Sequence, residues 1–291
     1  MINVTNLNKS FGDLHVLKNI NLTLEKGTIF GLVGINGAGK STFLRLLSGV
    51  LLPESGNVYV DEIELGENQE LRKNVFYLSD QPTYTLHMTI KDLKELYKVF
   101  YPFDEKTFQS ILDLFNLSEQ MILNRISKGM KRQAYIAAAF ASNAKYLLLD
   151  EVFDGLDPVA RLKFKKLMID SASVDKIFIL TSHSLRELED ICDSFGIIDE
   201  GYFKRFGHLS DELSKLTKYQ IILKDKNPYP ILDLHLNLLY FQQEGRVLTL
   251  IIEGNHQPLE KIFNANDYHA IDESSISFEE YFMVYQGGAT K

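Results

Sequence analysis

Residues 34–42 carry the strongest chemical signal in this sequence. They read GINGAGKST, a run of glycines that ends in a lysine and two hydroxyl residues. Glycine can adopt a positive φ without a Cβ clash, so consecutive backbone N–H groups can turn inward around phosphate oxygens. At this spacing Lys40 can reach β- and γ-phosphates, and the Ser41 hydroxyl can hold a magnesium ion. The segment is therefore predicted to bind a nucleoside triphosphate with Mg²⁺.

The residues on either side of this loop belong to elements that can hold it in place. Residues 29–33 form an apolar run typical of a buried strand, and residues 41–49 show the amphipathic pattern of a helix. Such a helix directs the positive end of its dipole at the phosphates. A glycine-rich turn that binds nothing, the alternative, does not require this context. The predicted phosphate-binding residues are Asn36, Gly37, Ala38, Gly39, Lys40, Ser41 and Thr42.

Two acidic residues follow a second apolar run. Residues 146–149 read YLLL, and Asp150 and Glu151 come directly after them. At the carboxyl end of a buried strand, Asp150 can contact the magnesium through its water shell. Glu151 can orient and deprotonate a water molecule on the γ-phosphate side. Two adjacent acids can also form a solvated turn, and the nearby phosphate-binding loop is what favours the catalytic interpretation.

His183 follows the next apolar run, residues 177–180. A histidine at this point can donate to a γ-phosphate and respond to its presence. An isolated histidine after a strand is more often a solvent-facing residue, so this hypothesis depends on the motifs around it.

The composition is that of an acidic globular protein. The 291 residues suffice for one large α/β domain and a smaller one, and 45% of them are hydrophobic. A net charge of −8 argues against a nucleic-acid partner, which would select a basic face. No apolar run is long enough to span a membrane, and the N-terminus lacks the pattern of a signal peptide. The single cysteine, Cys192, fits a reducing cytosol and is interpreted as a small core residue on the buried side of a helix.

Strand-like and helical patterns divide the chain into regions. The expected strands are residues 2–7, 20–24, 29–33, 58–61, 75–78, 146–149 and 177–180, residues 201–207 form a short strand or hairpin, and a helical pattern fills residues 89–141. The composition changes from about residue 208, where we expect strands at 220–223 and 247–252 and helices at 258–264 and 278–285. This order predicts an α/β domain with an inserted helical part, followed by a small α+β appendage.

Residues 126–133 read ISKGMKRQ and precede an apolar helix. This segment resembles the signature motif of ATP-binding cassette (ABC) ATPases, usually written LSGGQ. The resemblance implies that Ser127 and Gly129 cap the γ-phosphate bound by the other subunit. The departures are Ile126 for leucine, Lys128 for glycine and Met130 for glutamine. The Ser-Lys-Gly-Met form looks like the version found in bacterial exporter ATPases.

The resemblance covers residues 1–207, with the motifs in the family's order. It implies that Phe11 stacks on adenine, that Glu151, His183 and Lys40 are catalytic, and that Asp157 links two active sites. The implied fold is a P-loop NTPase core of the ABC ATPase type with an antiparallel β subdomain. Residues 1–207 would be the nucleotide-binding domain, with a helical subdomain at about 82–142, and residues 208–291 a separate α+β domain.

In this family a glutamine couples the bound nucleotide to the membrane part of the transporter. The segment YLSDQP, residues 77–82, contains two candidates for this coupling position. Alignment on Tyr77 places Asp80 at that position, whereas Gln81 has the expected residue type. We favour Gln81 as an ATP-binding and metal-binding residue, because an amide can bind magnesium and the attacking water without added charge. Asp80 remains the alternative.

The resemblance implies the ATP-hydrolysing subunit of a bacterial ABC exporter that moves drugs, peptides or lipids. Two copies, or one copy and a paralogue, would close head to tail over two ATP–Mg²⁺ and drive separate integral-membrane permease subunits. The protein would be cytoplasmic and peripheral on the inner face of the cell membrane. The aromatic stretch from Tyr84 to Phe103 is either a groove for a permease helix or helical core packing.

Two other functions are weighed against this one. A soluble ABC ATPase acting on ribosomes or DNA usually has two cassettes or a long coiled coil, and neither is apparent in this sequence. For an importer ATPase subunit, residues 208–291 are too short for the larger regulatory domain of sugar importers.

Overall fold

The computed structural model describes residues 1–66, 68–172, 175–226, 237–254, 263 and 266–286. The chain divides into two compact units, Met1–Phe206 and Gly207–Lys291, which are described separately.

A six-stranded sheet forms the centre of the first unit, in the order β10-β9-β3-β8-β7-β6. Its strands are β3 (Ile29–Val33), β6 (Val75–Leu78), β7 (Tyr146–Leu149), β8 (Ile177–Thr181), β9 (Ser194–Asp199) and β10 (Tyr202–His208). The pairs β6–β7, β7–β8, β8–β3 and β3–β9 are parallel. Strands β3, β7 and β8 are buried throughout, as expected for apolar runs in a parallel sheet. Because parallel strands end at the same edge, the loops after β3, β6, β7 and β8 gather there.

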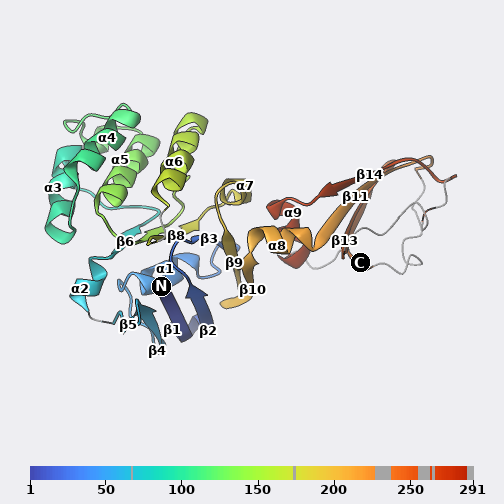
Figure 1. The fold of residues 1–291 in the computed structure, drawn as a ribbon, viewed down its shortest axis with the longest axis horizontal. Helices are drawn as coiled ribbons and strands as arrows, with labels where there is room; N and C mark the ends of the chain where they lie inside the picture. The colour runs from blue at the N-terminus through green and yellow to red at the C-terminus, as the bar shows by residue number, and fades with distance from the viewer. Residues whose placement is uncertain (67, 173–174, 227–236, 255–262, 264–265, 287–291) are drawn as a thin grey trace. The chain divides into compact units, whose positions relative to one another are not determined.

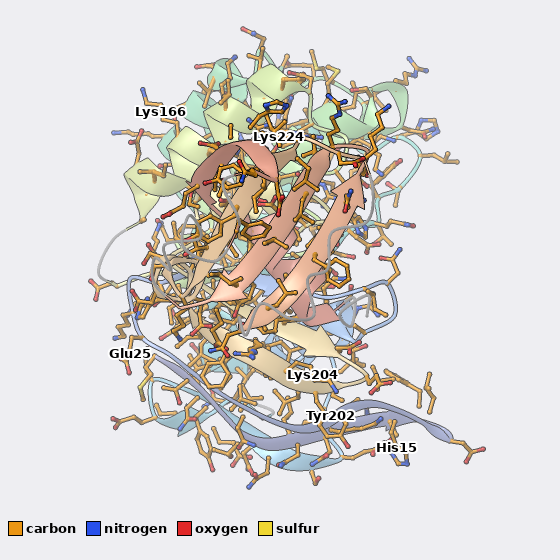
Figure 2. All side chains as sticks on the ribbon, turned by 90° about the vertical axis from the view of Figure 1, so that its right-hand side faces the viewer. His15, Glu25, Lys166, Tyr202, Lys204 and Lys224 are labelled. Carbon is orange, nitrogen blue, oxygen red and sulfur yellow. The ribbon has the colours of Figure 1, made fainter. Side chains whose placement is uncertain are left out.

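Strand β10 lies at one edge of this sheet and carries exposed polar side chains. Lys204 and Tyr202 project from it, and the ammonium groups of Lys204 and Lys18 lie over the Tyr202 ring (Figure 2). Charged side chains on an edge strand oppose pairing with another sheet.

A second sheet is antiparallel and has the order β2-β1-β4-β5. It consists of β1 (Ile2–Phe11), β2 (Leu14–Leu24), β4 (Ser55–Val60) and β5 (Ile63–Glu64). Helix α1 (Lys40–Leu47) contributes Phe43, Leu44 and Leu47 to one core that also contains side chains from β1, β3 and β8. The loop before α1 is therefore fixed between two sheets.

The remaining helices of this unit include three, α3, α4 and α5, in the region 89–141 that was expected to be helical. They are α2 (Gln69–Arg72), α3 (Ile90–Phe100), α4 (Glu105–Leu114), the 3₁₀ turn η1 (Leu123–Arg125), α5 (Lys128–Ala141), α6 (Pro158–Ser171) and α7 (Leu185–Glu189). Figure 1 shows α3, α4 and α5 grouped together. Local side chains fix where these helices begin, since Thr89 and Asp92 form a capping box on α3 and Asp104 caps α4.

The second unit has its own sheet and core. Its elements are α8 (Leu209–Ser214), β11 (Leu216–Leu223), β12 (Leu238–Glu244), β13 (Val247–Glu253), β14 (Tyr268–Ser275) and α9 (Phe278–Gln286). The sheet order is β12-β13-β11-β14, and Lys218 on β11 forms an ion pair with Glu280 on α9.

The predicted α/β class is confirmed, but several element boundaries are wrong. Strands 2–7 and 20–24 extend to residues 2–11 and 14–24, because asparagines interrupt the apolar alternation where the β1–β2 register shifts. There, Asn8 and Asn21 side chains accept from the backbone N–H groups of Asn19 and Asn6. The predicted helix at 258–264 lies outside the described residues, apart from Phe263, which is not helical.

Cys192 is buried as expected, but it lies beyond the end of α7 and not within a helix. Its sulfur packs against Gly31 on β3. In the part of the chain described here, no helix has the length and apolar character needed to cross a membrane.

Candidate active site

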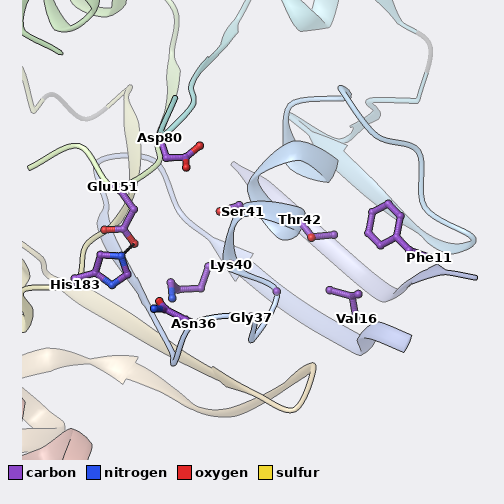
Figure 3. A pocket seen from close by; sticks show the side chains of 11 residues that line it. Phe11, Val16, Asn36, Gly37, Lys40, Ser41, Thr42, Asp80, Glu151 and His183 are labelled. Carbon is purple, nitrogen blue, oxygen red and sulfur yellow. Dashed lines mark ion pairs between the residues drawn. The ribbon is translucent and has the colours of Figure 1, made fainter. Parts of the chain in front are cut away.

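A cavity of about 450 Å³ lies at the edge where the parallel strands end. Its wall consists of Phe11, Val16, Asn36, Gly37, Gly39, Lys40, Ser41, Thr42, Asp80, Glu151 and His183. Figure 3 shows Phe11 and Val16 at one end, Glu151 and His183 at the other, and Lys40 and Ser41 between them. The structure thus brings together residues of β1 and β2, of the loop and helix after β3, and of the segments after β6, β7 and β8. Such a cavity can accept an elongated ligand with a flat group at one end and anionic groups at the other.

The loop before α1 has the conformation that its glycines were expected to allow. Gly37 has φ +82° and Gly39 has φ +107°. A Cβ atom on Gly39 would lie 2.8 Å from Leu17 Cδ2, so a side chain there would be both strained and crowded. Ala38 is buried and contributes to the core, not to the cavity wall.

Lys40 is buried, and its ammonium group is held by neutral carbonyls of the loop. Nζ donates to Gly34 O at 2.6 Å and to Ile35 O at 3.2 Å. Burial lowers the pKa of Lys40, and the charges of Glu151 and Asp150 oppose that effect. The positive charge of Lys40 and the N-terminus of α1 both favour an anion in the cavity.

The acid pair is divided between the core and the cavity. Asp150 is fully buried, and its carboxylate accepts from Thr181 Oγ1 at 2.7 Å and from the Tyr77 hydroxyl at 3.2 Å. Glu151 lines the cavity, with Oε1 at 3.6 Å from Nε2 of His183 (Figure 3). Burial raises the pKa of Glu151, and the charges of His183 and Lys40 partly offset this. A carboxylate with a raised pKa is a stronger base than an ordinary glutamate.

The oxygen donors around the cavity suit magnesium together with a phosphate ligand. Among the residues that the structure describes, no group of three or more His, Cys, Asp or Glu side chains could hold a metal ion. The Ser41 hydroxyl and Asp80 line the cavity, whereas the Asp150 carboxylate, just after β7, is buried behind the cavity wall and would act through water. Mg²⁺ is typically bound by one or two such protein groups, with water and phosphate oxygens completing its octahedron. The residues present therefore fit Mg²⁺ bound with a nucleotide.

The two candidates for the coupling position are placed differently. Asp80 lines the main cavity and also a neighbouring cavity of about 360 Å³, whereas Gln81 is exposed and lines only the neighbouring one. Residues 80 and 81 form a bend after the end of β6, and of the two only Asp80 borders the main cavity. Asp80, the alternative candidate, is therefore the one placed beside Lys40 and Glu151 in the cavity wall.

Ser127, Gly129 and Asp157 do not join the residues of the main cavity. The Ser127 hydroxyl accepts from Met130 N–H at 3.2 Å and caps α5, and Asp157 accepts from Ala160 N–H at 2.9 Å and caps α6. A Cβ atom on Gly129 would lie 2.3 Å from Gly155 O, so the start of α5 packs closely on the turn before α6. Ser127 and Asp157 are exposed on that surface.

Three residues of the site region were not predicted from the sequence, namely Val16, which lines the cavity, Arg132 and Thr181. Arg132 on α5 is 3% exposed, and its guanidinium donates to Ser79 O at 2.8 Å and to Asp80 O at 2.5 Å. Burial lowers the pKa of Arg132. The Thr181 hydroxyl, at the end of β8, donates a hydrogen bond to the Asp150 carboxylate and accepts one from the Glu151 N–H. A polar residue at the end of an apolar strand was the only available signal for Thr181.

The aromatic stretch from Tyr84 to Phe103 is divided between core packing and an open cavity. Tyr97 and Tyr101 pack on Phe76, which is core packing. Tyr84 and Leu96, in contrast, line an open cavity of about 670 Å³.

Comparison with known proteins identifies relatives of this architecture. The sequence pattern described as "ABC transporter" matches residues 17–154. The ABC transporter ATP-binding protein YtrB of Bacillus subtilis is 28% identical over 99% of both chains. The bacitracin transport ATP-binding protein BcrA of Bacillus licheniformis is 29% identical over 100% of this chain and 98% of its own.

Two further similarities agree with these. The linearmycin resistance ATP-binding protein LnrL of Bacillus subtilis is 31% identical over 74% of this chain and 72% of its own. A solved structure titled as the ATP binding subunit of an ABC transporter superposes with a TM-score of 0.68 and 27% identity, covering 74% of this chain and 92% of the other.

Proposed function

This chain belongs to the ABC transporter ATP-binding proteins, and we propose that it is the ATP-hydrolysing subunit of a bacterial exporter that drives a separate membrane permease. One observation carries the proposal: Lys40, Glu151 and His183, from the ends of three different strand–helix connections, line one cavity with the phosphate-binding glycines. The relatives named for bacitracin transport and linearmycin resistance support export over a ribosome-acting, DNA-acting or importer ATPase.

The cavity suggests how each residue acts on ATP. Phe11 would stack on the adenine, while the loop N–H groups and Lys40 bind the phosphates. Ser41 and Asp150 would hold Mg²⁺, with Asp80 as a further candidate, and the bound ion would neutralise charge on the phosphate oxygens. Glu151 would accept a proton from the attacking water, and His183, 3.6 Å from it, would donate to the γ-phosphate.

The partner would be a second nucleotide-binding subunit, either another copy of this chain or a paralogue. ATP-binding subunits of ABC transporters work as dimers and with membrane permeases. Ser127, Gly129 and Asp157 lie outside the main cavity, next to one another along the start of α5 and the turn before α6. In a head-to-tail dimer they would cap the nucleotide held by the partner subunit.

We assign residues 1–207 to the nucleotide-binding domain, with a helical subdomain at about 82–142, and residues 208–291 to a separate α+β domain. The cavity lined by Tyr84 and Leu96 would receive a cytoplasmic helix of the permease. The protein would then lie on the inner face of the cell membrane.

The first test replaces the proposed base with its amide. Glu151→Gln should bind ATP with unchanged affinity, lose hydrolysis by at least about 100-fold, and form an ATP-dependent dimer on size-exclusion chromatography. Glu25→Gln, at an exposed position, is the matched control and should behave like wild type. Hydrolysis by Glu151→Gln at the wild-type rate would exclude Glu151 as the base.

The second test concerns the partner. The tagged protein is isolated from gently solubilised cells and its companions are identified. Recovery of a hydrophobic membrane protein supports the exporter assignment, and recovery of ribosomes without one contradicts it.

A further inference from the structure

Strand β8 ends in a residue that does not match the rest of the strand. It reads IFILT, and all five residues are buried. Thr181 is 0% exposed. A hydroxyl that is removed from water destabilises the fold unless it finds hydrogen-bond partners, so the partners of Thr181 indicate why it is there.

The parallel register places Thr181 beside the acid pair. Leu149 on β7 is opposite Leu180 on β8, so the residues that follow them, Asp150 and Thr181, are neighbours. Thr181 Oγ1 donates to Asp150 Oδ1 at 2.7 Å and accepts from the backbone N–H of Glu151 at 2.7 Å. A hydroxyl has one hydrogen to donate and lone pairs to accept, and Thr181 directs both functions at two consecutive residues.

The backbone of Glu151 is in a conformation that needs this support. Its φ is +47°, in the left-handed region that residues with a Cβ rarely adopt. Such conformations persist where the surrounding structure fixes them from several sides. The N–H of Glu151 is fixed by Thr181, and its carbonyl accepts from Asp154 N–H at 3.0 Å. The direction of the Glu151 side chain into the cavity follows from this backbone.

We propose that Thr181 is a positioning residue for ATP hydrolysis, which orients Glu151 toward the attacking water and fixes the Asp150 carboxylate. The inference rests on the proposed function of the cavity. Within the described part of the chain, the cavity wall does not include Thr181, so its effect passes through the two acids. Loss of the hydroxyl should therefore affect turnover and leave nucleotide binding in place.

The test compares two substitutions with a matched control. Thr181→Val keeps the shape and removes both hydrogen bonds, whereas Thr181→Ser keeps the hydroxyl. The control is Ser142→Ala, because Ser142 is also 0% exposed, and its hydroxyl donates to Ala139 O at 2.6 Å and accepts from Ala144 N–H at 3.2 Å. Ser142 lies at the end of α5 and outside the cavity wall. Ser142→Ala therefore also removes a buried hydroxyl with two hydrogen bonds, but at a distance from the acid pair.

Two measurements are made on each variant. Steady-state kinetics should show that kcat of Thr181→Val falls at least about tenfold, while KM for ATP stays within about twofold and Thr181→Ser regains most of the rate. In the protein without nucleotide or metal, amide hydrogen exchange of the peptide containing Glu151 should accelerate in Thr181→Val and not in Ser142→Ala.

The outcomes separate a positioning role from a structural one. If Thr181→Val and Ser142→Ala both lose thermal stability and both keep kcat, the proposal is wrong. It is equally wrong if Thr181→Ser is as slow as Thr181→Val, because the methyl packing and not the hydroxyl would then matter. Failure of the proposed function looks different, since wild type itself would not hydrolyse ATP.

Discussion

Lys128 forms an ion pair with Asp154, and this contact joins the first turn of α5 to the turn that follows Glu151. Lys128 occupies the position of the first glycine of the LSGGQ signature motif. Its positive charge is therefore specific to the Ser-Lys-Gly-Met form. The hydrogen bond from Lys128 lowers the pKa of Asp154. The pair connects the segment proposed to contact a partner's nucleotide with the segment that carries the proposed base.

We expect this ion pair to contribute little to stability. The side chains of Lys128 and Asp154 are 61% and 49% exposed, so water screens their attraction. In a double-mutant cycle of Lys128→Ala and Asp154→Asn, urea unfolding should give a coupling energy below about 1 kcal/mol. A coupling near 3 kcal/mol would show that the pair is far less solvated than its exposure indicates.

The two coupling-position candidates can be separated by their effect on hydrolysis. Asp80→Ala should lower kcat roughly tenfold or more, because its carboxylate lines the cavity. Gln81→Ala, whose side chain lines the neighbouring cavity, should keep kcat within about twofold. ATPase assays with purified variants decide this, and the reverse ranking would restore the assignment to Gln81.

Phe11 should contribute to binding of the adenine ring of ATP and not to binding of the phosphates. Its ring is 49% exposed at the end of the cavity opposite Glu151 (Figure 3). Stacking of a base on an aromatic ring is worth roughly 1–3 kcal/mol, so Phe11→Ala should weaken ATP binding by roughly tenfold. Calorimetric titration with inorganic tripolyphosphate provides the control, since its affinity should not change, and Phe11→Tyr should bind ATP like wild type.

Arg132 should be a stability determinant. Replacing it with alanine leaves the half-buried Ser79 and Asp80 carbonyls without their charged donor, and the free energy of unfolding should fall by about 2 kcal/mol. Lys166→Ala, at an exposed position on α6, is the comparison and should change it by less than about 0.5 kcal/mol. Equal effects from the two substitutions in urea titrations would contradict the assignment.

The carboxylate of Asp61 gives a pH-dependent prediction. Burial raises its pKa, but hydrogen bonds from the N-terminal amine, Tyr146 and Lys26 outweigh this and lower it to about 2. Because the folded-state pKa is below the ordinary value of 3.8, the stabilisation is present above about pH 4 and disappears as the pH falls toward 2.

Asp61→Asn should therefore lower the free energy of unfolding at pH 7 and not at pH 2. Since the side chain is 34% exposed, solvent screening limits the expected loss to about 1 kcal/mol. Denaturation curves of both proteins across this range test it. A difference that is independent of pH would mean that packing, and not charge, is responsible.

The cavity could be largely predicted because its residues lie in short motifs after apolar strands. Once residues 29–33, 146–149 and 177–181 pair in parallel, Lys40, Glu151 and His183 must meet at one edge. The Asp80 or Gln81 choice could not be made in this way, since it depends on which way one side chain of two neighbours points. Arg132 contacts Asp80, which is 52 positions away, and Thr181 contacts Asp150, which is 31 positions away. A pattern of neighbouring residues in the sequence cannot predict such contacts.

Two of the strands that were not predicted, β14 and β9, show why the sequence pattern failed there. β14 reads YHAIDESS and is largely exposed, so it lacks the apolar alternation that marks a half-buried strand. β9 reads SFGIID, and its glycine resembles a turn signal although the segment is buried between β3 and β10. Tertiary pairing, and not intrinsic preference, determines both.

The position of Cys192 makes this chain convenient for site-specific labelling. Its thiol is buried behind Gly31, and burial, together with the charge of Asp193, raises its pKa far above the ordinary value. Thiolate is the reactive form, so maleimide dyes should modify the native residue very slowly. A cysteine introduced at exposed Val159 could then carry a fluorophore without prior removal of the natural one, and energy transfer between two labelled copies would report their approach.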